Sequence, residues 1–248
     1  MNSYGLIGKK LSHSYSPQIF ERIFKEKNIS DAEFKLFELN DINQFTSLLS
    51  SSSSIKGLSV TIPYKEQIIP FLTELSPEVN KIQAVNSIKI ERHNNIIKTT
   101  GYNTDTYGFE QSIKPFLEMH HHRALIIGTG GASKAVHFVL KNIGIDCLFV
   151  SRNPLKQNQI SYNQLNKFIL ENHYLIVNTS PIGMFPNNNF QPEIPYEHIT
   201  EKHLCYDLIY NPSETNFMIK AKQQGAITMN GWQMLNFQAE KSWQLWND

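Results

Sequence analysis

Polar side chains that can bind or react with a ligand cluster at three places in the first part of the chain. The clusters are HSYS at residues 13–16, SVT at 59–61 and NTD at 103–105, each beside a stretch that we predict as a strand. Taken singly, such a cluster is ordinarily a helix cap or a turn. Ligands of open α/β sheets bind at the carboxyl ends of strands, so the three clusters together favour a site for a small polar molecule.

Lys65 adds a cation to this region. The sequence TIPYK places it in the first turn of a helix that follows the strand ending at Pro63. The helix dipole disfavours a cation at that position. Lys65 is therefore either an ordinary solvated lysine or a side chain held there for a chemical role.

A glycine-rich turn begins the second half of the chain. The apolar run ALIIG leads into GTGGAS at residues 128–133, and a βαβ unit follows from there. Such a turn lets the backbone approach a pyrophosphate at a helix N-terminus. Ser133 occupies the position of the third glycine of the dinucleotide fingerprint, so a glycine turn without a ligand stays open as the alternative. The candidate cofactor-binding residues are Gly128, Thr129, Gly130, Gly131 and Ala132.

The end of the next strand indicates which dinucleotide is bound. An NAD site places an acidic residue about 20 positions after the glycines, where it accepts a hydrogen bond from the ribose 2′-hydroxyl. Here Arg152 follows Gly131 by 21 positions, with Ser151 before it and Lys156 close behind. Cationic side chains suit the 2′-phosphate of NADP. We therefore infer NADP, the alternative being that Arg152 is simply an exposed arginine.

Composition excludes several classes of protein. The 248 residues carry 23 Lys and Arg against 22 Asp and Glu, a net charge of +1. No field of one sign is therefore present to bind nucleic acid or an anionic membrane. The first residues do not resemble a signal peptide, and no apolar run approaches the roughly 18 residues of a spanning helix. We expect a soluble cytoplasmic protein.

Cysteine and histidine give no sign of a metal site. Cys147 and Cys205 lie in apolar stretches without metal-ligand spacing, as expected of buried thiols in a reducing compartment. The run HHH at 120–122 is predicted to be an exposed linker, because adjacent residues do not point to one centre. No disulfide and no metal is expected.

Apolar periodicity predicts an α/β fold, in which short β-branched or aromatic runs alternate with longer amphipathic ones. Strands are predicted over 3–8, 33–39, 57–62, 84–91, 96–100, 124–128, 146–150, 174–178, 204–208 and 226–229. Helices are predicted from Ser16 onward and over 41–49, 64–72, 77–82, 134–144, 162–171, 214–224 and 231–246. The turn at 93–95 makes a hairpin, so the first sheet is expected to be mixed.

Two helices carry more specific expectations. Ser16 is predicted to cap the first helix, with Pro17 at its first position and a buried face formed by Ile19, Phe20, Ile23 and Phe24. The last helix aligns one apolar stripe, which we expect to pack in the core rather than to bind a cofactor. The stripe consists of Trp232, Leu235, Ala239, Trp243 and Trp246. We expect one domain from 1–101 with 229–248, and a second from 102–228.

Nine motifs together resemble the shikimate dehydrogenase family, in order and spacing, across nearly the whole chain. They are GKKLSHSYSP (8–17), GLSVTIPYK (57–65), AVNSI (84–88), GYNTDTYG (101–108), GTGGAS (128–133), SRN (151–153), NTSPIGM (178–184), DLIYNPSET (207–215) and NGWQMLNFQA (230–239). The resemblance implies reversible reduction of 3-dehydroshikimate by NADPH, a step in making aromatic amino acids. It also implies a mixed-sheet substrate domain, a Rossmann-like NADP-binding domain and a C-terminal helix that returns to the first domain.

The resemblance also assigns roles to residues. Residues matching Lys65 and Asp105 flank the reacting oxygen in the family. An ammonium there stabilises and protonates the developing alkoxide, a role worth roughly 10² to 10⁴ in rate, and Asp105 orients it. The implied substrate-binding residues are Ser14, Ser16, Ser59, Thr61, Asn86, Thr104, Tyr210 and Gln238. The further implied cofactor-binding residues are Asn178, Thr179, Ser180, Leu208 and Gly231.

Departures from the family pattern bear on substrate preference. Ser59 replaces the asparagine of the family's N-V-T motif, and Tyr102 replaces an acidic residue beside Asn103. One alternative is therefore a quinate/shikimate dehydrogenase with relaxed use of NAD and NADP. A second alternative is a catalytically silent NADP-binding sensor. In such a protein we would expect Lys65 and Asp105 to be lost, whereas both are present. The expected partner is a small-molecule substrate, with no nucleic acid and no membrane, and the protein is expected to be a monomer or a homodimer.

Overall fold

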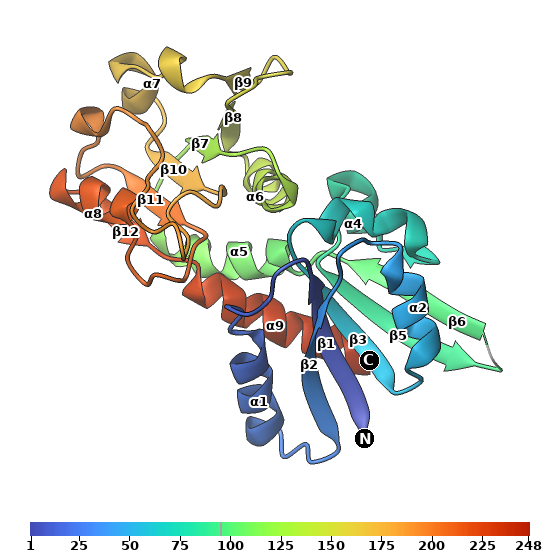
Figure 1. The fold of residues 1–248 in the computed structure, drawn as a ribbon. Coiled ribbons are helices and arrows are strands. Elements are labelled where there is room, and N and C mark those ends of the chain that lie inside the picture. Colours follow the sequence, from blue (N-terminus) through green and yellow to red (C-terminus); the bar gives the residue numbers. More distant parts are fainter. Residues whose placement is uncertain (95) are drawn as a thin grey trace. The chain divides into compact units, whose positions relative to one another are not determined.

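The computed structural model describes residues 1–94 and 96–248 and divides into two compact units. Unit 1 comprises residues 1–107 and 236–248, and unit 2 comprises residues 108–235 (Figure 1). The chain changes unit within two helices, α5 (Asp105–Ile113) and α9 (Trp232–Asn247). The domain boundaries predicted from the sequence lie a few residues earlier at each crossing and stay predictions.

Unit 1 contains a mixed six-stranded sheet in the order β2-β1-β3-β5-β6-β4. Strand β5 runs antiparallel to β3 and β6, whereas the other pairs are parallel. The mixed sheet expected from the sequence is confirmed, although part of its hairpin turn, Asn95, lies outside the described residues. The strands are β1 (Asn2–Gly8), β2 (Ala32–Glu38), β3 (Ile55–Val60), β4 (Glu74–Leu75), β5 (Ser87–His93) and β6 (Ile96–Tyr102).

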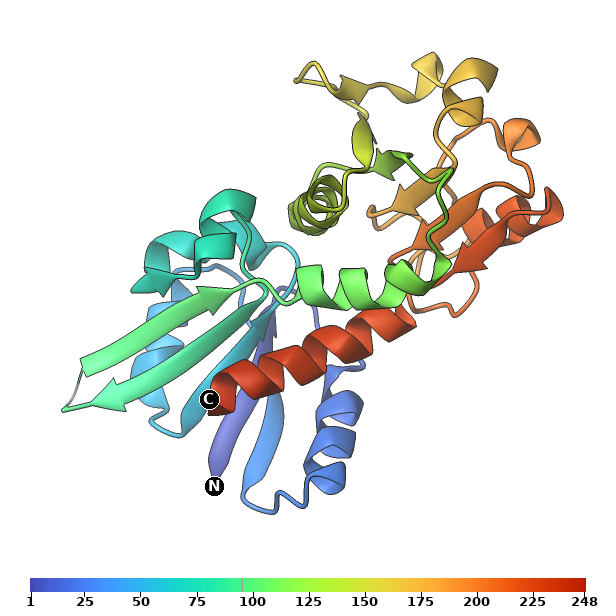
Figure 2. The same cartoon turned by 180° about the vertical axis from the view of Figure 1, so that it is seen from behind.

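Helices cover both faces of this sheet. One face packs against α2 through Phe45 and Leu49. The other packs against α1 and the C-terminal part of α9, which crosses the sheet (Figure 2), and Phe20 of α1 stacks on Trp246 with ring centroids 5.2 Å apart. The helices of this unit are α1 (Ser16–Glu26), α2 (Gln44–Ser51), α3 (Tyr64–Gln67) and α4 (Pro77–Ile82), with a 3₁₀ turn η1 (Ile69–Phe71).

Two details of these helices differ from the sequence prediction. The helix expected over 64–72 breaks into α3 and η1, because Pro70 cannot donate a backbone hydrogen bond. Ser16 does not cap α1; the cap position is Tyr15, and the hydroxyl of Ser14 instead accepts a bond from the Ser16 amide at 3.2 Å. The predicted buried face of α1 is confirmed.

Gly57 shows why α9 can lie so close to the sheet. A Cβ atom at this position of β3 would lie 2.3 Å from the indole ring of Trp246. Carbon atoms in contact need about 3.5 to 4.0 Å. The absence of a side chain at Gly57 therefore creates the space that Trp246 fills.

Unit 2 contains an all-parallel sheet in the order β12-β11-β10-β7-β8-β9. The chain fills one side of the sheet from β7 to β9 and then the other from β10 to β12, so the strand order reverses between β7 and β10. This is the Rossmann-like arrangement predicted from the sequence. The strands are β7 (Arg123–Ile127), β8 (Asp146–Val150), β9 (Gln159–Ile160), β10 (Leu175–Asn178), β11 (Leu204–Asp207) and β12 (Ile227–Met229).

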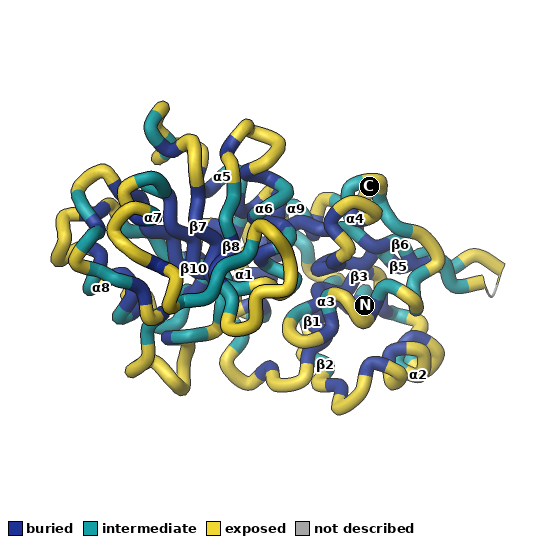
Figure 3. The backbone as a smooth tube through the Cα atoms, turned by 90° about the horizontal axis from the view of Figure 1, so that it is seen from above, coloured by how far each residue is buried: buried dark blue, intermediate teal, exposed yellow. Residues whose placement is uncertain are grey.

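Alternate side chains of these strands pack on opposite layers of helices. Ile126 packs with α5 and α6, whereas its neighbour Ile127 packs with α7 and α8. Figure 3 shows β7 and β10 as buried segments. The remaining helices are α6 (Gly131–Asn142), α7 (Lys167–Glu171) and α8 (Asn216–Gln223), with 3₁₀ turns η2 (Lys114–Phe116), η3 (Tyr162–Gln164) and η4 (Tyr196–His198).

Several elements of this region correct the sequence prediction. No helix was expected at α5, whose apolar residues follow a polar first turn. The helix expected over 162–171 is divided into η3 and α7, because the side chain of Asn166 caps α7 by accepting a bond from the Ile169 amide at 3.1 Å. In the predicted stripe of α9, Trp243 and Trp246 are buried, but Trp232 is 39% exposed.

The histidine run is not an exposed linker throughout. His121 is buried, and its Nδ1 accepts a hydrogen bond from the Glu118 amide at 2.9 Å. Burial lowers the pKa of His121, which favours the neutral ring. Within residues 1–94 and 96–248, no three His, Cys, Asp or Glu side chains converge on a possible metal position. Both cysteines are free thiols. None of the described helices combines the length and apolar character needed to cross a bilayer.

Candidate active site

Lys65 and Asp105 form a close ion pair in unit 1. The Nζ of Lys65 donates to Oδ2 of Asp105 at 2.5 Å. The side chains are 17% and 8% exposed, so the pair is shielded from solvent but open at the ammonium. Lys65 lies in the short helix α3, and Asp105 begins α5. The structure therefore brings together the two residues to which the family resemblance assigns acid-base chemistry.

Asn86 fixes the carboxylate from its other side. Its Nδ2 donates to Oδ1 of Asp105 at 2.8 Å and to the hydroxyl of Thr104 at 3.0 Å, while its Oδ1 accepts from the Thr104 amide at 2.6 Å. Gln238 of α9 joins the group as an acceptor for Asn86 at 3.4 Å. Asp105 is thus held by two partners, which leaves its position little freedom.

Sheet topology explains why these residues meet. Thr61 follows the carboxyl end of β3, and the segment from Asn103 to Asp105 follows the carboxyl end of β6. Because β5 runs antiparallel to both strands, Asn86, just before β5, lies at the same edge of the sheet. Strand direction therefore gathers polar residues from three separate motifs at one end of unit 1.

The other predicted substrate-binding residues fall into two sets. In unit 1, Ser16 and Ser59 are buried, whereas Ser14 and Thr61 are half-buried. Tyr210 belongs to unit 2. The hydroxyl of Ser59 is buried and has no hydrogen-bond partner among the described residues. A buried hydroxyl of this kind is available to a polar ligand.

Ser242 belongs to this cluster although the sequence analysis did not identify it. Its hydroxyl lies 2.9 Å from that of Thr104. The sequence does contain a signal, because Ser242 follows Gln238 by one helical turn and therefore shares its face of α9. The amide oxygen of Asn103, also buried, lacks a partner among the described residues.

The glycine turn in unit 2 connects β7 to the N-terminus of α6. Gly128 has φ +108°, a conformation that favours glycine, and its amide donates to the Val150 carbonyl at 2.9 Å. Gly130 is the cap residue of α6, and a Cβ there would meet no atom within 4 Å. Open space beside exposed helix amides suits the pyrophosphate of a dinucleotide. Thr129, Gly131 and Ala132 complete the predicted turn.

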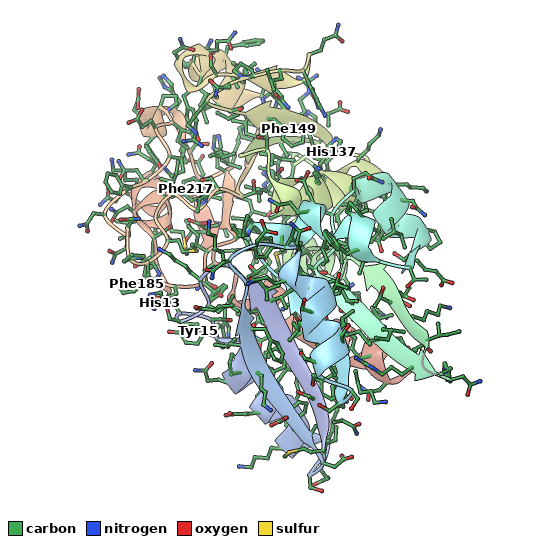
Figure 4. All side chains as sticks on the ribbon, turned by 45° about the vertical axis from the view of Figure 1, so that its right-hand side comes forward. His13, Tyr15, His137, Phe149, Phe185 and Phe217 are labelled. Atoms are coloured by element: carbon green, nitrogen blue, oxygen red, sulfur yellow. The ribbon has the colours of Figure 1, made fainter. Side chains whose placement is uncertain are left out.

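The helix after the turn is held at its N-terminus and along its middle. The hydroxyl of Ser133, at the position of the third glycine, donates to the Gly130 carbonyl at 2.6 Å. Further along α6, His137 packs against Phe149 of β8 with ring centroids 5.2 Å apart (Figure 4). Ser133 therefore closes the turn through its own hydrogen bond, so its presence is compatible with dinucleotide binding.

Arg152 follows β8 and lines a cavity of about 570 Å³. The same cavity is lined by Tyr162, Ile182 and Phe190, which offer aromatic and apolar surface, and by Glu193. A guanidinium beside aromatic walls fits the adenosine 2′-phosphate part of NADP. Ser151 is half-buried, and Lys156 is exposed and does not line this cavity. No motif in the sequence points to Tyr162, Phe190 or Glu193 as part of this site.

The remaining predicted cofactor residues lie at or just after the ends of β10, β11 and β12. Thr179 donates through its hydroxyl to the Ile127 carbonyl at 2.7 Å, which joins the end of β10 to that of β7. A Cβ at Gly231 would lie 2.0 Å from the Leu208 carbonyl oxygen, so this position requires glycine. Asn178 and Ser180 are bonded to each other, with Ser180 Oγ donating at 2.7 Å.

Comparison with known proteins agrees with this geometry. The family model of the shikimate dehydrogenase substrate binding domain matches residues 6–88. A shikimate dehydrogenase (NADP+) of Clostridium botulinum is 36% identical over 257 residues, which cover 99% of this chain and 96% of the relative.

Two crystal structures are also similar. Shikimate dehydrogenase 1 from Peptoclostridium difficile superposes with a TM-score of 0.88 and 38% identity, covering 100% of this chain and 92% of that one. The Thermus thermophilus enzyme in complex with NADP(H) and shikimate gives 0.85 and 25% identity, covering 99% and 93%. By sequence and by fold, the chain belongs to the shikimate dehydrogenase family.

Proposed function

We propose that this protein catalyses the reversible, NADPH-dependent reduction of 3-dehydroshikimate to shikimate, a step in aromatic amino acid biosynthesis. The observation that carries the proposal is the shielded Lys65–Asp105 pair, held by Asn86 among polar side chains at one edge of unit 1. A relative of known structure holds both shikimate and NADP(H). An inactive protein could also belong to the family. This chain, however, retains Lys65 and Asp105, the two groups that the reaction needs.

Lys65 acts as the proton donor in the direction of reduction. Negative charge develops on the carbonyl oxygen as the carbon is reduced, and an ammonium within hydrogen-bond reach stabilises that charge. Lys65 then gives the oxygen a proton, which an arginine in its place would hold too tightly. In the direction of oxidation, the neutral amine of Lys65 accepts the proton from the substrate hydroxyl.

Asp105 orients this proton donor and binds the reacting hydroxyl. Its Oδ2 accepts from Lys65 and its Oδ1 accepts from Asn86, so the carboxylate is fixed in one orientation. The substrate carboxylate and ring hydroxyls bind to neutral donors and acceptors around this pair. In unit 1 these are Ser14, Ser16, Ser59, Thr61, Asn86, Thr104 and Gln238. Tyr210, which belongs to unit 2, is assigned to the substrate by the family resemblance alone.

Unit 2 binds NADP. When bound, NADPH supplies the hydride for the reduction. The amides of the turn from Gly128 to Ala132 bind the pyrophosphate, and Arg152 binds the 2′-phosphate. Ser151 and Lys156, which are near Arg152 in the sequence, are the further predicted contacts of that phosphate. Thr179, Leu208 and Gly231, together with Asn178 and Ser180, hold the rest of the cofactor. We expect the enzyme to act in the cytoplasm as a monomer or a homodimer.

The direct test is the initial rate of shikimate oxidation with NADP, followed by absorbance at 340 nm. The proposal expects turnover with shikimate, and a specificity constant kcat/KM higher with NADP than with NAD. Absence of turnover, with NADP still bound, would indicate the alternative of a silent NADP-binding sensor.

A second substrate has one observation in its favour. The buried hydroxyl of Ser59, which lacks a partner among the described residues, stands where the family pattern has an asparagine. A shorter side chain leaves room for a substrate with a different ring substituent. Quinate is therefore the second candidate, and the ratio of specificity constants for shikimate and quinate decides between the two.

A further inference from the structure

Asp207 is a buried carboxyl group that the proposed reaction does not use. It ends β11 and has no exposed surface. Its Oδ1 accepts from Asn178 Nδ2 at 3.0 Å and from the Ile209 amide at 3.1 Å, and its Oδ2 accepts from the Thr215 hydroxyl at 2.7 Å. Both carboxylate oxygens are thus engaged with groups from three different segments.

Two of these segments carry predicted cofactor residues at this edge of unit 2. Asn178, bonded directly to Asp207, in turn accepts from the amide of Ser180 at 3.1 Å and from its hydroxyl. Leu208 adjoins Asp207, and the carbonyl of Ile209 accepts from the Gly231 amide at 3.0 Å. Asp207 is therefore bonded directly to Asn178 at the end of β10 and to Ile209 after β11, and through Ile209 it is linked to Gly231, the glycine before α9.

The third partner connects this group to a helix. Thr215 caps α8, accepting from the Met218 amide at 3.4 Å while donating to Asp207. Asp207 accepts three hydrogen bonds through its two oxygens. An asparagine would replace one of these oxygens with an NH₂ group, which donates, so only a carboxylate can accept all three bonds.

A charged carboxylate at this position is energetically costly, because Asp207 is buried away from water. Burial raises the pKa of Asp207 to about 6, against hydrogen bonds that lower it. Among the described residues, Lys, Arg and His form no ion pair with Asp207; its partners are an amide, a hydroxyl and a backbone N–H. A carboxylate that lowers folding stability in this way is expected where the arrangement of the segments bonded to it matters for function.

We propose that Asp207 is a positioning residue for the cofactor: it fixes the Asn178–Ser180 loop and the Leu208–Ile209 segment in the arrangement that binds NADP. The inference rests on the proposed function only for the identity of the cofactor. Asp207 itself does not touch the reacting atoms. It acts through Asn178 and through the backbone of Ile209.

The test compares three variants of the full chain. Asp207→Ala removes all three hydrogen bonds that the carboxylate accepts. Asp207→Asn keeps the shape of the side chain but places a donor where one of the accepting oxygens was. Cys205→Ala, at a buried position of the same strand outside the hydrogen-bond group, is the matched control for loss of packing. For each, we measure the NADP dissociation constant by calorimetry, KM for NADP and for shikimate, kcat and the melting temperature.

We expect Asp207→Ala to weaken NADP binding by about tenfold or more and Asp207→Asn by about threefold. KM for shikimate should change little in either, and Cys205→Ala should leave the NADP dissociation constant unchanged even where it lowers the melting temperature. Wild-type NADP affinity in both Asp207 variants, or an equal loss in Cys205→Ala, would overturn the inference.

Two further outcomes stay decisive. If Asp207→Ala does not fold, Asp207→Asn alone decides, and unaltered NADP affinity in that variant overturns the proposal. If the wild-type chain binds NADP but does not oxidise shikimate, the proposed function fails while the calorimetric comparison still tests Asp207.

Discussion

The Nζ of Lys65 lies 2.5 Å from Oδ2 of Asp105, although 40 positions separate the two residues in the chain. Lys65 comes from a one-turn helix after β3, and Asp105 begins the helix after β6. Both side chains are largely shielded from water, so each charge is compensated mainly by the other and by Asn86. The relationship holds the ammonium in one place and largely out of solvent, as the proposed role of proton donor requires.

Replacing Lys65 with alanine should abolish most of the activity. We expect kcat to fall by about 10²-fold or more, because the alkoxide loses its stabilising charge and its proton donor. NADP binding should be nearly unchanged. Steady-state kinetics and calorimetry measure the two effects, and Lys56→Ala, an exposed lysine of β3, is the control. Turnover that barely changes in Lys65→Ala would show that the assigned role is wrong.

Replacing Arg152 with alanine should discriminate between the two dinucleotides. Hydrogen bonds to a charged group contribute about 1.5 to 3 kcal/mol, so NADP should bind about 10- to 150-fold more weakly. NAD lacks the 2′-phosphate, so its dissociation constant should rise by about twofold at most. Dissociation constants of both cofactors provide the comparison, with the exposed Lys167→Ala as control. Equal losses for NADP and NAD would remove the argument for a 2′-phosphate contact.

Two glycines of the turn should respond differently to alanine. At Gly130 a methyl group meets no atom within 4 Å, so Gly130→Ala should change the free energy of unfolding by less than about 0.5 kcal/mol. It should nevertheless weaken NADP binding by about tenfold, because the methyl group intrudes where the pyrophosphate approaches the backbone.

Gly128→Ala is the companion variant. Its φ of +108° is unfavourable for alanine, and the methyl group would lie 2.9 Å from Thr179 Oγ1. We expect it to lower stability by about 1 to 3 kcal/mol as well as affinity. Denaturant unfolding and calorimetry on both variants give the comparison. Unaltered NADP affinity in Gly130→Ala would place the pyrophosphate elsewhere.

Asp207 should make folding stability depend on pH in a defined direction. Its pKa is raised from 3.8 to about 6 in the folded chain. Between these values the folded protein keeps a proton that the unfolded chain has lost, so raising the pH favours unfolding by about 1.4 kcal/mol per pH unit. This contribution is fully present below pH 3.8 and is lost as the pH rises through about 6.

Asp207→Asn isolates this effect from other titrating groups. The free energy of unfolding of the wild type minus that of Asp207→Asn should fall between about pH 4.5 and 6 and level off above pH 6. Urea unfolding across pH 4.5 to 7.5 measures the difference. A difference that stays constant with pH would show that Asp207 titrates at an ordinary value in the folded protein.

The local sequence predicts most of the helices and strands correctly and a few of them incorrectly. The amphipathic pattern of α1 and the glycine turn before α6 predict what the structure contains, because each depends on neighbours along the chain. The break at Pro70 and the cap at Asn166 are also local signals, although the helices predicted over 64–72 and 162–171 run through them. Burial of His121 has no such signal, since it depends on where distant segments pack.

Motifs in the sequence were by themselves sufficient for the α/β class and the family, and they singled out Arg152, Lys65 and Asp105 as candidates for the site. Tertiary structure alone decided which groups surround them: the antiparallel direction of β5 brings Asn86 to Asp105, and Ser242 reaches Thr104 across 138 positions. The physical reason is that residue type and spacing specify local conformation and chemistry. Hydrogen bonds between distant segments, such as those that gather around Asp207, depend on strand order and packing, which no short stretch of sequence contains.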